Sequence, residues 1–296
     1  MPGSYARALQ KANTLPADAL IFDLEDAVAP DAKPLARDLV CAAVAEGGYG
    51  GREVVIRVNA LETPWGMDDL KASCAAGPDA ILVPKVVHSG DIISAVKILQ
   101  SLHAAKTIRL WAIMETPMAI VNARTIAATA VYKENRLDCL VMGTNDLLKE
   151  SRARALHDRF AIVPWLAVTI VAARAYRLDI LDGFITTSTM RPACALNASM
   201  AAPPAWTARH SFIRARLRLA TMSSRQPMRE IVWARKVIDA FGQPENAAKG
   251  VIVVEGRMVE RLHFAMAQRT VAIAERIDAM HQALPATVPS HIRALA

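Results

Sequence analysis

The sequence predicts an α/β fold, a barrel of the TIM (β/α)8 type, on three observations. From residue 17 to residue 183, nearly continuous apolar runs alternate with segments of helical periodicity, which is typical of a parallel sheet covered by helices. The chain of 296 residues has the length of one such barrel. Two successive apolar runs end on a carboxylate, at the strand end where barrels of this type carry their functional groups.

The elements are predicted in chain order from hydrophobic periodicity. Apolar runs predict strands at residues 17–28, 52–59, 79–86, 109–115, 137–146, 178–183 and 250–256. Amphipathic periodicity predicts helices at residues 4–15, 34–46, 66–75, 90–104, 118–128, 162–176, 231–241 and 259–280. Pro34 falls in the first turn of its helix, where a missing N–H costs no helical hydrogen bond.

Glu115 and Asp146 are the candidate ligands of a metal ion. Each follows one of two successive predicted strands, and the C-terminal ends of barrel strands converge on one cavity. Mg²⁺ prefers oxygen ligands and is commonly held by one or two carboxylates together with water and substrate. The alternative is local, with Glu115 capping a helix that starts at Thr116 and Asp146 opening a helix at 147–150. Their matching positions favour Mg²⁺, with Mn²⁺ as the alternative ion.

Cysteine usage and hydropathy predict a cytoplasmic protein without a membrane partner. The four cysteines show neither zinc-site nor disulfide-framework spacing, so we expect reduced, structural thiols; they are Cys41, Cys74, Cys139 and Cys194. The chain opens without a signal-peptide pattern. No apolar run reaches the roughly 18 residues of a membrane-spanning helix.

The positive net charge comes from a single segment. Seven arginines and no acidic residue lie within residues 184–229, and the net charge of the whole chain is +7, so the rest of the chain is neutral. Between the first and last of these arginines only Trp206 and Phe212 are aromatic. Because aromatic side chains usually stack on the bases of single-stranded nucleic acid, we expect no nucleic-acid partner.

Six short motifs occur in a specific order: FDLEDAVAP at 22–30, VIRVN at 55–59, ILVPK at 81–85, METP at 114–117, GTNDL at 143–147 and GRMVE at 256–260. Together they resemble the HpcH/HpaI aldolase and citrate lyase beta subunit-like family, which includes malyl-CoA lyases. The resemblance implies a Mg²⁺-dependent barrel that cleaves or forms a carbon–carbon bond of a 3-hydroxyacyl-CoA such as malyl-, citramalyl- or citryl-CoA. The implied partners are the acyl-CoA thioester and a small 2-oxo acid, with acetyl-CoA or propionyl-CoA as the other product.

The resemblance also implies roles for single residues. Glu115 and Asp146 match the family's metal ligands, and Arg57 matches the arginine that holds the oxo acid and polarises its oxygen. Glu25 and Asp26 match acids that hydrogen-bond water on the metal. A cation beside a guanidinium would stabilise the charge that such a cleavage builds on oxygen.

The sequence alone leaves an alternative role open for several of these residues. Glu260 matches an acidic residue that reaches a neighbouring subunit's site, but its pattern fits a solvated helix position better. Arg57 would also fit a strand-end ion pair, and Glu25 and Asp26 would also fit loop acids that begin a turn. Lys85, which ends a predicted strand, fits a structural role as well as a functional one.

Residues 184–229 depart from the family pattern, and we interpret them as a compensated frameshift. Read one base out of register, the codons for 184–187 permit Tyr-Asn-Asp, and those for 206–217 permit Asp-Gly-Lys-Thr-Leu-Ile-His-Pro-Ser-Gln-Ile, the family's last barrel strand. The segment mixes prolines with arginines at no steady period, so we expect it to be irregular.

The expected consequence is a barrel that is incomplete at the seam between its first and last strands. The family also has a strand ahead of Pro2, where this chain begins. About six strands with two open edges should remain, since closure is what normally removes the edges. The predicted domains are a barrel at 1–242, including the aberrant segment 184–229, and a C-terminal helical extension at 243–296.

The leading functional prediction is a CoA-ester carbon–carbon lyase. One alternative is a class II pyruvate-type aldolase that uses the same carboxylates on free 2-oxo acids. A second is a catalytically impaired, non-enzymatic subunit, because citrate lyase beta chains work inside a larger complex. The family resemblance implies a homo-oligomer, a trimer or a hexamer.

Overall fold

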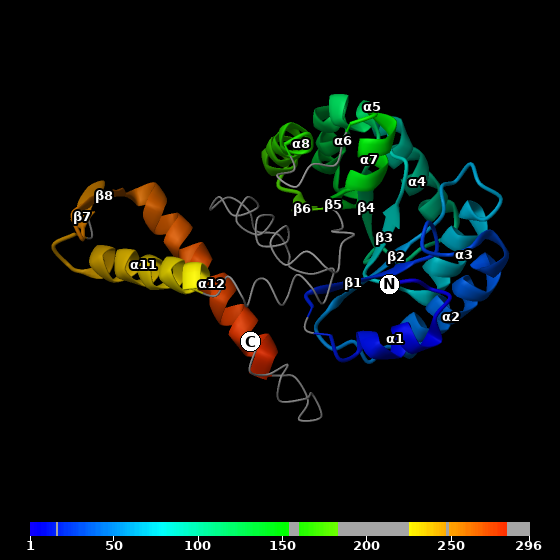
Figure 1. The fold of residues 1–296 in the computed structure, drawn as a ribbon, viewed down its shortest axis with the longest axis horizontal. Helices are drawn as coiled ribbons and strands as arrows, with labels where there is room; N and C mark the ends of the chain where they lie inside the picture. Colours follow the sequence, from blue (N-terminus) through cyan, green and yellow to red (C-terminus); the bar gives the residue numbers. More distant parts are fainter. Residues whose placement is uncertain (16, 154–159, 183–224, 247–248, 283–296) are drawn as a thin grey trace. The chain divides into compact units, whose positions relative to one another are not determined.

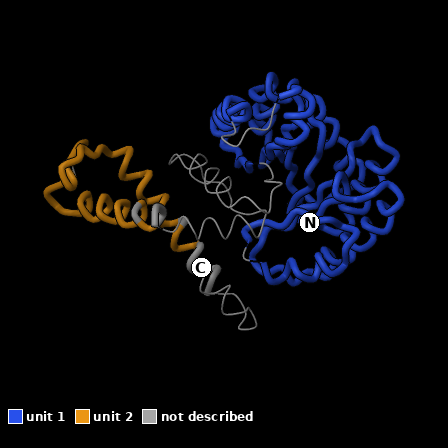
Figure 2. Tube along the Cα trace, in the orientation of Figure 1, with its two compact units in different colours: residues 1–189, 207–213 blue, residues 190–206, 214–296 orange. Residues whose placement is uncertain are grey.

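A computed structural model describes residues 1–15, 17–153, 160–182, 225–246 and 249–282 (Figure 1). The chain divides into two compact units (Figure 2). The first comprises residues 1–189 and 207–213, and the second comprises residues 190–206 and 214–296. Most of the predicted aberrant segment, namely residues 184–224, lies outside the described residues.

The first unit is built on one parallel sheet whose six strands follow chain order from β1 to β6. The strands are β1 (Ala19–Asp23), β2 (Glu53–Arg57), β3 (Ala80–Val83), β4 (Arg109–Met114), β5 (Leu137–Met142) and β6 (Asp179–Leu181). Each strand pairs in parallel with the next, and the sheet curls into half of a barrel (Figure 1). The predicted α/β barrel fold, incomplete at one seam, is confirmed.

Helices connect the strands and cover the outer side of the sheet (Figure 1). They are α1 (Ala6–Ala12), α2 (Lys33–Glu46), α3 (Gly66–Ala76), α4 (Ser89–Ser101), α5 (Pro117–Val121), α6 (Ala123–Ala128), α7 (Thr144–Glu150) and α8 (Val163–Ala175), with 3₁₀ turns η1 (Pro30–Ala32), η2 (Thr129–Val131) and η3 (Lys133–Asn135). The single helix predicted at 118–128 is interrupted at Asn122. The Nδ2 of Asn122 donates to the carbonyl of Val87 at 2.8 Å, a tertiary contact that a local pattern does not show.

The inner face of the sheet carries an apolar core contributed entirely by strands. Its buried members are Ala19, Ile21, Val55, Ala80, Leu82, Trp111, Ile113, Cys139 and Leu181. Side chains alternate between the two faces of a strand, so Asp23, Arg57 and Glu115 continue these rows beyond the apolar layer. The sheet therefore points polar groups from three strands into the same end of the half-barrel.

The two end strands of the sheet mark the predicted open seam. Among the described residues, β6 pairs with β5 alone, while β1 pairs with β2 and forms one isolated parallel bridge, from Asp23 to Pro2. The amide of Gly3 donates to the carbonyl of Asp23 at 2.8 Å, and the amide of Asp23 donates to the carbonyl of Met1 at 2.8 Å. Residues 1–3 thus lie along the outer edge of β1, where a closed barrel would have another strand.

The second unit is a pair of helices joined by a β-hairpin. Its elements are α11 (Arg225–Gly242), β7 (Val251–Val254), β8 (Arg257–Glu260) and α12 (Arg261–Gln282). The hairpin turn is formed by Glu255 and Gly256, both at positive φ, as a type I′ turn requires. Ala234, Val237, Phe241, Ile252, Val254, Val259 and Ala267 form its buried core.

Two expectations need correction in the second unit. The sequence analysis predicted one strand at 250–256 followed by a helix from Val259, but 257–260 form a second strand, because the turn at Glu255 reverses the chain. The helix α11 begins at Arg225, inside the segment expected to be irregular up to residue 229. It packs with α12 and β7 and lies in the second unit. The domain boundary that the sequence analysis placed at residue 242 stays a prediction.

Two further features bear on the composition-based expectations. Within the described ranges, no helix is both long enough and apolar enough to cross a membrane. Cys41 and Cys74 are free thiols, and burial raises the pKa of Cys41 to about 11. Cys194 lies outside the described residues.

Candidate functional site

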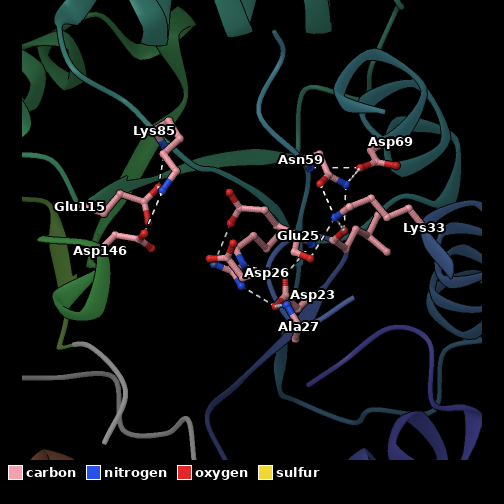
Figure 3. A network of polar contacts seen from close by, with 12 residues as sticks. Asp23, Glu25, Asp26, Ala27, Lys33, Asn59, Asp69, Lys85, Glu115 and Asp146 are labelled. Carbon is pink, nitrogen blue, oxygen red and sulfur yellow. Dashed lines mark hydrogen bonds and ion pairs between the residues drawn. The ribbon is translucent and has the colours of Figure 1, made fainter. Parts of the chain in front are cut away.

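The candidate site lies at the C-terminal ends of the barrel strands (Figure 3). Asp23 is the last residue of β1, and Arg57 is the last residue of β2. Glu115 follows β4 directly, and Asp146 lies in the first turn of α7, just after β5. Parallel strands bring their carboxyl ends to one edge of a sheet, so residues far apart in the sequence become neighbours there.

Arg57 is held by a fork of hydrogen bonds to Asp23. The Nε of Arg57 donates to Asp23 Oδ1 at 2.6 Å, and its Nη2 donates to Asp23 Oδ2. The two residues are register partners in the β1–β2 pairing, which aligns their side chains on the inner face. Burial alone would raise the pKa of Asp23, but the hydrogen bonds and charge of Arg57 hold the pKa below its ordinary value. A guanidinium has five N–H donors, so this fork leaves others for further acceptors.

The sequence analysis did not assign Asp23 to the site. It predicted a strand at residues 17–28 but could not tell which of the acidic residues in that range faces inward. The signal was present in the alternation of Ala19, Ile21 and Asp23, which places Asp23 on the face of the inner core. Arg57 therefore forms a strand-end ion pair, as the alternative reading of this residue predicted, and Asp23 is its principal partner.

Glu25 and Asp26 reach Arg57 from the loop that follows β1. The Nη1 of Arg57 lies 2.8 Å from Glu25 Oε2 and 3.4 Å from Asp26 Oδ2. Glu25 Oε2 is buried, and the described residues offer it no hydrogen bond of good geometry in spite of that short contact. Burial raises the pKa of Glu25 to about 8 against the lowering effect of Arg57, with further raising contributions from Glu115 and Asp26.

Glu115 and Asp146, the two predicted metal ligands, converge on one cationic group. The Nζ of Lys85 lies 3.6 Å from Glu115 Oε1 and 3.4 Å from Asp146 Oδ1 (Figure 3). The Lys85 backbone amide also donates to Glu115 Oε1 at 2.7 Å, from a residue in the left-handed region at φ 56°. The structure thus brings together the two carboxylates that the sequence analysis paired. It also gives Lys85 a contact that the sequence analysis left open.

The electrostatics of this pair favour a positive charge beside it. The Glu115 side chain is 1% exposed, and burial raises the pKa of its carboxyl group, opposed by Lys85. Burial alone would lower the pKa of Lys85, but Glu115, Asp146 and Glu25 raise it above its ordinary value. The charge of Arg57 also lowers the pKa of Glu115, and the charge of Glu115 raises the pKa of Glu25. The residues around Arg57 and those around Lys85 therefore form one electrostatic site.

Gly143 explains how the two carboxylates come so close. A Cβ on Gly143 would lie 2.3 Å from Glu115 Cβ and 2.9 Å from Glu115 Oε2. The amide of Gly143 donates to the carbonyl of Met114 at 3.0 Å, which ties the end of β5 to the end of β4. The GTNDL motif therefore begins with glycine because its backbone passes directly beside Glu115, and Asp146 follows three residues later.

The residues present fit a small divalent cation. The ligand oxygens would be those of Glu115 and Asp146, which already share a cation in their contacts with Lys85. In the part of the chain that the structure describes, no group of three or more acidic, histidine or cysteine side chains could hold a metal. Mg²⁺ does not need one, since it keeps several waters and is usually bound through one or two carboxylates plus substrate.

Glu260 lies in the second unit, as the last residue of β8. Its backbone amide donates to His263 Nδ1 at 2.9 Å, a contact typical of the start of a helix. The sequence analysis placed Glu260 within a helix, and the structure places it just before α12. Its role at a neighbouring subunit's site stays a prediction.

Comparisons with known proteins agree with these motifs. Residues 1–202 match the family described as HpcH/HpaI aldolase/citrate lyase. The chain is 39% identical over 283 residues to the (3S)-malyl-CoA thioesterase of a Cereibacter sphaeroides strain, with 94% of each chain aligned. It is 26% identical over 265 residues to the citrate lyase subunit beta of Escherichia coli K12, covering 88% of this chain and 86% of that one.

The fold has a counterpart among solved structures. The protein CitE from Mycobacterium tuberculosis, in complex with magnesium, acetoacetate and coenzyme A, superposes with a TM-score of 0.74 at 22% identity. The superposition covers 92% of this chain and 96% of CitE. With the fold, the order of the motifs and the sequence matches taken together, the chain belongs to the HpcH/HpaI aldolase/citrate lyase family.

Proposed function

We propose that this protein cleaves a 3-hydroxyacyl-CoA ester of the malyl-CoA type, with Mg²⁺ held by Glu115 and Asp146. One observation carries the proposal. Two carboxylates from successive strand ends converge on a single cation within one electrostatic site that includes Arg57. The names of the relatives support it, since they are a malyl-CoA thioesterase and a citrate lyase subunit, and the CitE structure contains magnesium and coenzyme A.

The bound cation would supply Lewis-acid polarisation of a substrate oxygen. The protein's own contribution is orientation and charge. Asp23 holds Arg57 through a two-bond fork, so the remaining N–H donors of the guanidinium have a fixed direction. Donors held in advance, where negative charge develops on oxygen, lower the barrier because nothing has to reorganise during the reaction.

Carbon–carbon cleavage is the first candidate reaction. The bond between C2 and C3 of the acyl chain breaks, the 3-hydroxyl group loses its proton to become the carbonyl of a 2-oxo acid, and C2 gains a proton to give acetyl-CoA or propionyl-CoA. Negative charge develops on the 3-oxygen and on the thioester oxygen. Arg57 and a cation at Glu115 and Asp146 are suited to both oxygens.

Thioester hydrolysis is the second candidate reaction. It is favoured by the relative that is 39% identical over nearly the whole chain, which is named a thioesterase. Water would add to the thioester carbonyl, and the carbon–sulfur bond would break to release free coenzyme A and a hydroxy acid. The same guanidinium and cation would stabilise the oxyanion of this reaction, so the site geometry admits both reactions.

The products of purified protein with malyl-CoA and Mg²⁺ distinguish the two reactions. A lyase releases acetyl-CoA and glyoxylate without a free thiol. A hydrazine reagent then detects glyoxylate as its hydrazone, while a thiol reagent gives no signal. A thioesterase releases free coenzyme A and malate, and the thiol reagent responds. Citramalyl-, methylmalyl- and citryl-CoA extend the test to other acyl chains.

Two controls test whether the turnover depends on the proposed metal site. Glu115→Gln and Asp146→Asn should abolish turnover, and chelation of Mg²⁺ should do the same reversibly. Turnover of free 4-hydroxy-2-oxo acids alone would support the pyruvate-type aldolase instead. A folded, Mg²⁺-binding protein with no turnover of any of these substrates would support a non-enzymatic subunit.

The remaining expectations belong to this proposal. The acyl-CoA thioester and a small 2-oxo acid are its proposed partners, in a cytoplasmic homo-oligomer of three or six chains. Light scattering during gel filtration measures the oligomeric state directly.

A further inference from the structure

A buried lysine that no catalytic step uses lies behind the loop following β1. Lys33, at the start of α2, is 6% exposed, although lysine is rarely enclosed in proteins. Its Nζ donates to the carbonyls of Leu24 and Glu25, each at 3.0 Å, and to Asn59 Oδ1 at 2.6 Å. Figure 3 shows this network beside Glu25, on the side away from Glu115 and Asp146.

The three bonds use the full donor capacity of the ammonium group. An ammonium carries three N–H donors, and here all three reach uncharged oxygens. Enclosing a charge is unfavourable unless its surroundings compensate, and an apolar side chain would often be as stable. The tryptophan ring of Trp65, 5.0 Å from Nζ, offers part of that compensation. Three acceptor oxygens surround this position, and the three N–H donors of a lysine side chain explain why residue 33 is a lysine.

Asn59 and Asp69 extend the network into the helical layer. Asn59 Nδ2 donates to the carbonyl of Leu24 at 2.8 Å and also to Asp69 Oδ2. The backbone amide of Asn59 donates to the same Asp69 oxygen at 3.0 Å, and Asp69 is fully buried. Asp69 Oδ1 accepts from Arg37 Nε at 2.7 Å, so the chain of contacts ends on α2 and α3.

The other side of the same loop is tied to Asp23. The amide of Glu25 donates to Asp23 Oδ1 at 2.8 Å, and the amide of Ala27 donates to Asp23 Oδ2 at 3.2 Å. The loop is thus held at its amides by Asp23 and at its carbonyls by Lys33. Glu25, whose side chain contacts Arg57, lies between these two supports.

From this geometry we propose that Lys33 is a positioning residue, which fixes the loop after β1 so that Glu25 and Asp26 keep their contacts with Arg57. The kinetic part of the proposal rests on the proposed function, and the structural part does not. Lys33 touches no reacting group. It acts through the carbonyls of Leu24 and Glu25.

The first measurement is amide hydrogen exchange of residues 25–28. Lys33→Met removes the donors and keeps a long apolar stem, so this loop should lose protection. Leu99→Ala is the control for a general loss of stability, because Leu99 is fully buried on α4 and its truncation leaves a cavity. Equal loop protection in the two variants would overturn the proposal.

The second measurement is turnover at a temperature where both variants are folded. Displacement of a catalytic group by about 1 Å commonly lowers the rate about 10²-fold. Lys33→Met should lower kcat by that order with KM nearly unchanged, while Leu99→Ala should leave kcat per folded molecule unchanged. A Lys33→Met protein with unaltered kcat would overturn the proposal.

A double-mutant cycle separates positioning from stability. If Lys33 acts through Glu25 and Asp26, then Lys33→Met should cause no further loss of kcat in a Glu25→Gln, Asp26→Asn background, although it should still lower the Tm. Additive losses of kcat would contradict the proposal. Should Lys33→Met not fold, the same measurements with Asn59→Ala decide, since Asn59 accepts from Lys33 and donates to Leu24.

The outcomes for the two proposals are distinguishable. A wild-type protein without turnover of any CoA ester would refute the proposed function. The loop protection of residues 25–28 would then still decide whether Lys33 holds the loop.

Discussion

Arg57 illustrates how the site assembles from single side chains. Its guanidinium is fixed by Asp23 on the neighbouring strand, and it contacts Glu25 and Asp26 on the following loop. Burial is the main cause that raises the pKa of Glu25 and of Glu115, and neighbouring carboxylates raise both pKa values further. The residues of the site therefore favour an additional positive charge, and they respond to pH.

At the residue scale, the metal-free protein should lose stability as pH rises from about 4.5 to about 8 through the contribution of Glu25. Its pKa is raised from 4.5 to about 8, so within this window the folded state binds more protons than the unfolded state. Stability falls with rising pH wherever the folded state binds more protons. Urea denaturation in chelator at pH 5 and at pH 8 measures the effect.

Glu25→Gln isolates this contribution. The variant cannot titrate at position 25, so its stability relative to the wild-type protein should improve between pH 5 and pH 8. Asp23, with its lowered pKa, is ionised in the folded and the unfolded state throughout this range, so it adds no pH dependence to the comparison. A difference that is independent of pH would show that the folded protein does not raise the pKa of Glu25.

The two proposed ligands should control metal affinity. Replacing even an outer partner of a metal ligand typically costs about 10–100-fold in affinity, so Glu115→Gln and Asp146→Asn should each weaken Mg²⁺ binding by at least that factor. Titration calorimetry measures the change. Asp138→Asn is the matched control, because Asp138 lies on β5 near its other end and contacts Arg109. Unchanged affinity in both ligand variants would disprove the metal site.

At the scale of elements, the close approach of β4 and β5 is the critical feature. Gly143→Ala should displace Glu115, because the new Cβ would lie 2.3 Å from Glu115 Cβ. Overpacking of this kind costs about 1–3 kcal/mol of stability, and the metal site should weaken with it. Calorimetric Mg²⁺ titration and thermal unfolding measure both effects.

Gly51→Ala is the control for this substitution. No atom lies within 4 Å of its added Cβ, so neither stability nor metal affinity should fall. Normal Mg²⁺ affinity in Gly143→Ala would mean that Glu115 tolerates the displacement or does not bind the metal.

Most elements of the first unit could be predicted from hydrophobic periodicity. Each strand from β1 to β6 lies within a predicted apolar run, because buried parallel strands are apolar on both faces. The hairpin of β7 and β8 was not predicted, since Glu255 adopts a positive φ that glutamate rarely takes and that no local pattern indicates. The interruption at Asn122 depends on its bond to Val87, thirty-five residues away.

At the scale of the molecule, the six strands of the described residues form a half-barrel with an open seam. The family match ends at residue 202, inside the segment 184–229 that departs from the family pattern. The frameshift hypothesis stays a prediction, and sequencing of the coding DNA tests it. Codons 184–229 should spell the family's Tyr-Asn-Asp and last-strand motifs one base out of register. Codons unable to do so would disprove the hypothesis.

Restoring that reading frame should stabilise the first unit. A last strand beside the seam would satisfy the backbone groups at an open edge, since closure of a barrel leaves no unpaired edge. A gain of only about 2 kcal/mol raises the Tm of a domain of about 150–250 residues by roughly 4–8 °C. Thermal unfolding of the two chains should show at least this difference. Equal Tm values would mean that the restored segment adds no strand.

The sequence by itself determined the alternation of strands and helices and the pairing of Glu115 with Asp146, because both follow from local periodicity and from where a strand ends. Tertiary structure alone decided that Asp23 holds Arg57 and that Lys33 supports the loop carrying Glu25. Asp23 and Arg57 are thirty-four residues apart, and Lys33 and Asn59 are twenty-six apart. Such contacts depend on the register between strands and on helix packing, and neither is encoded in any local segment.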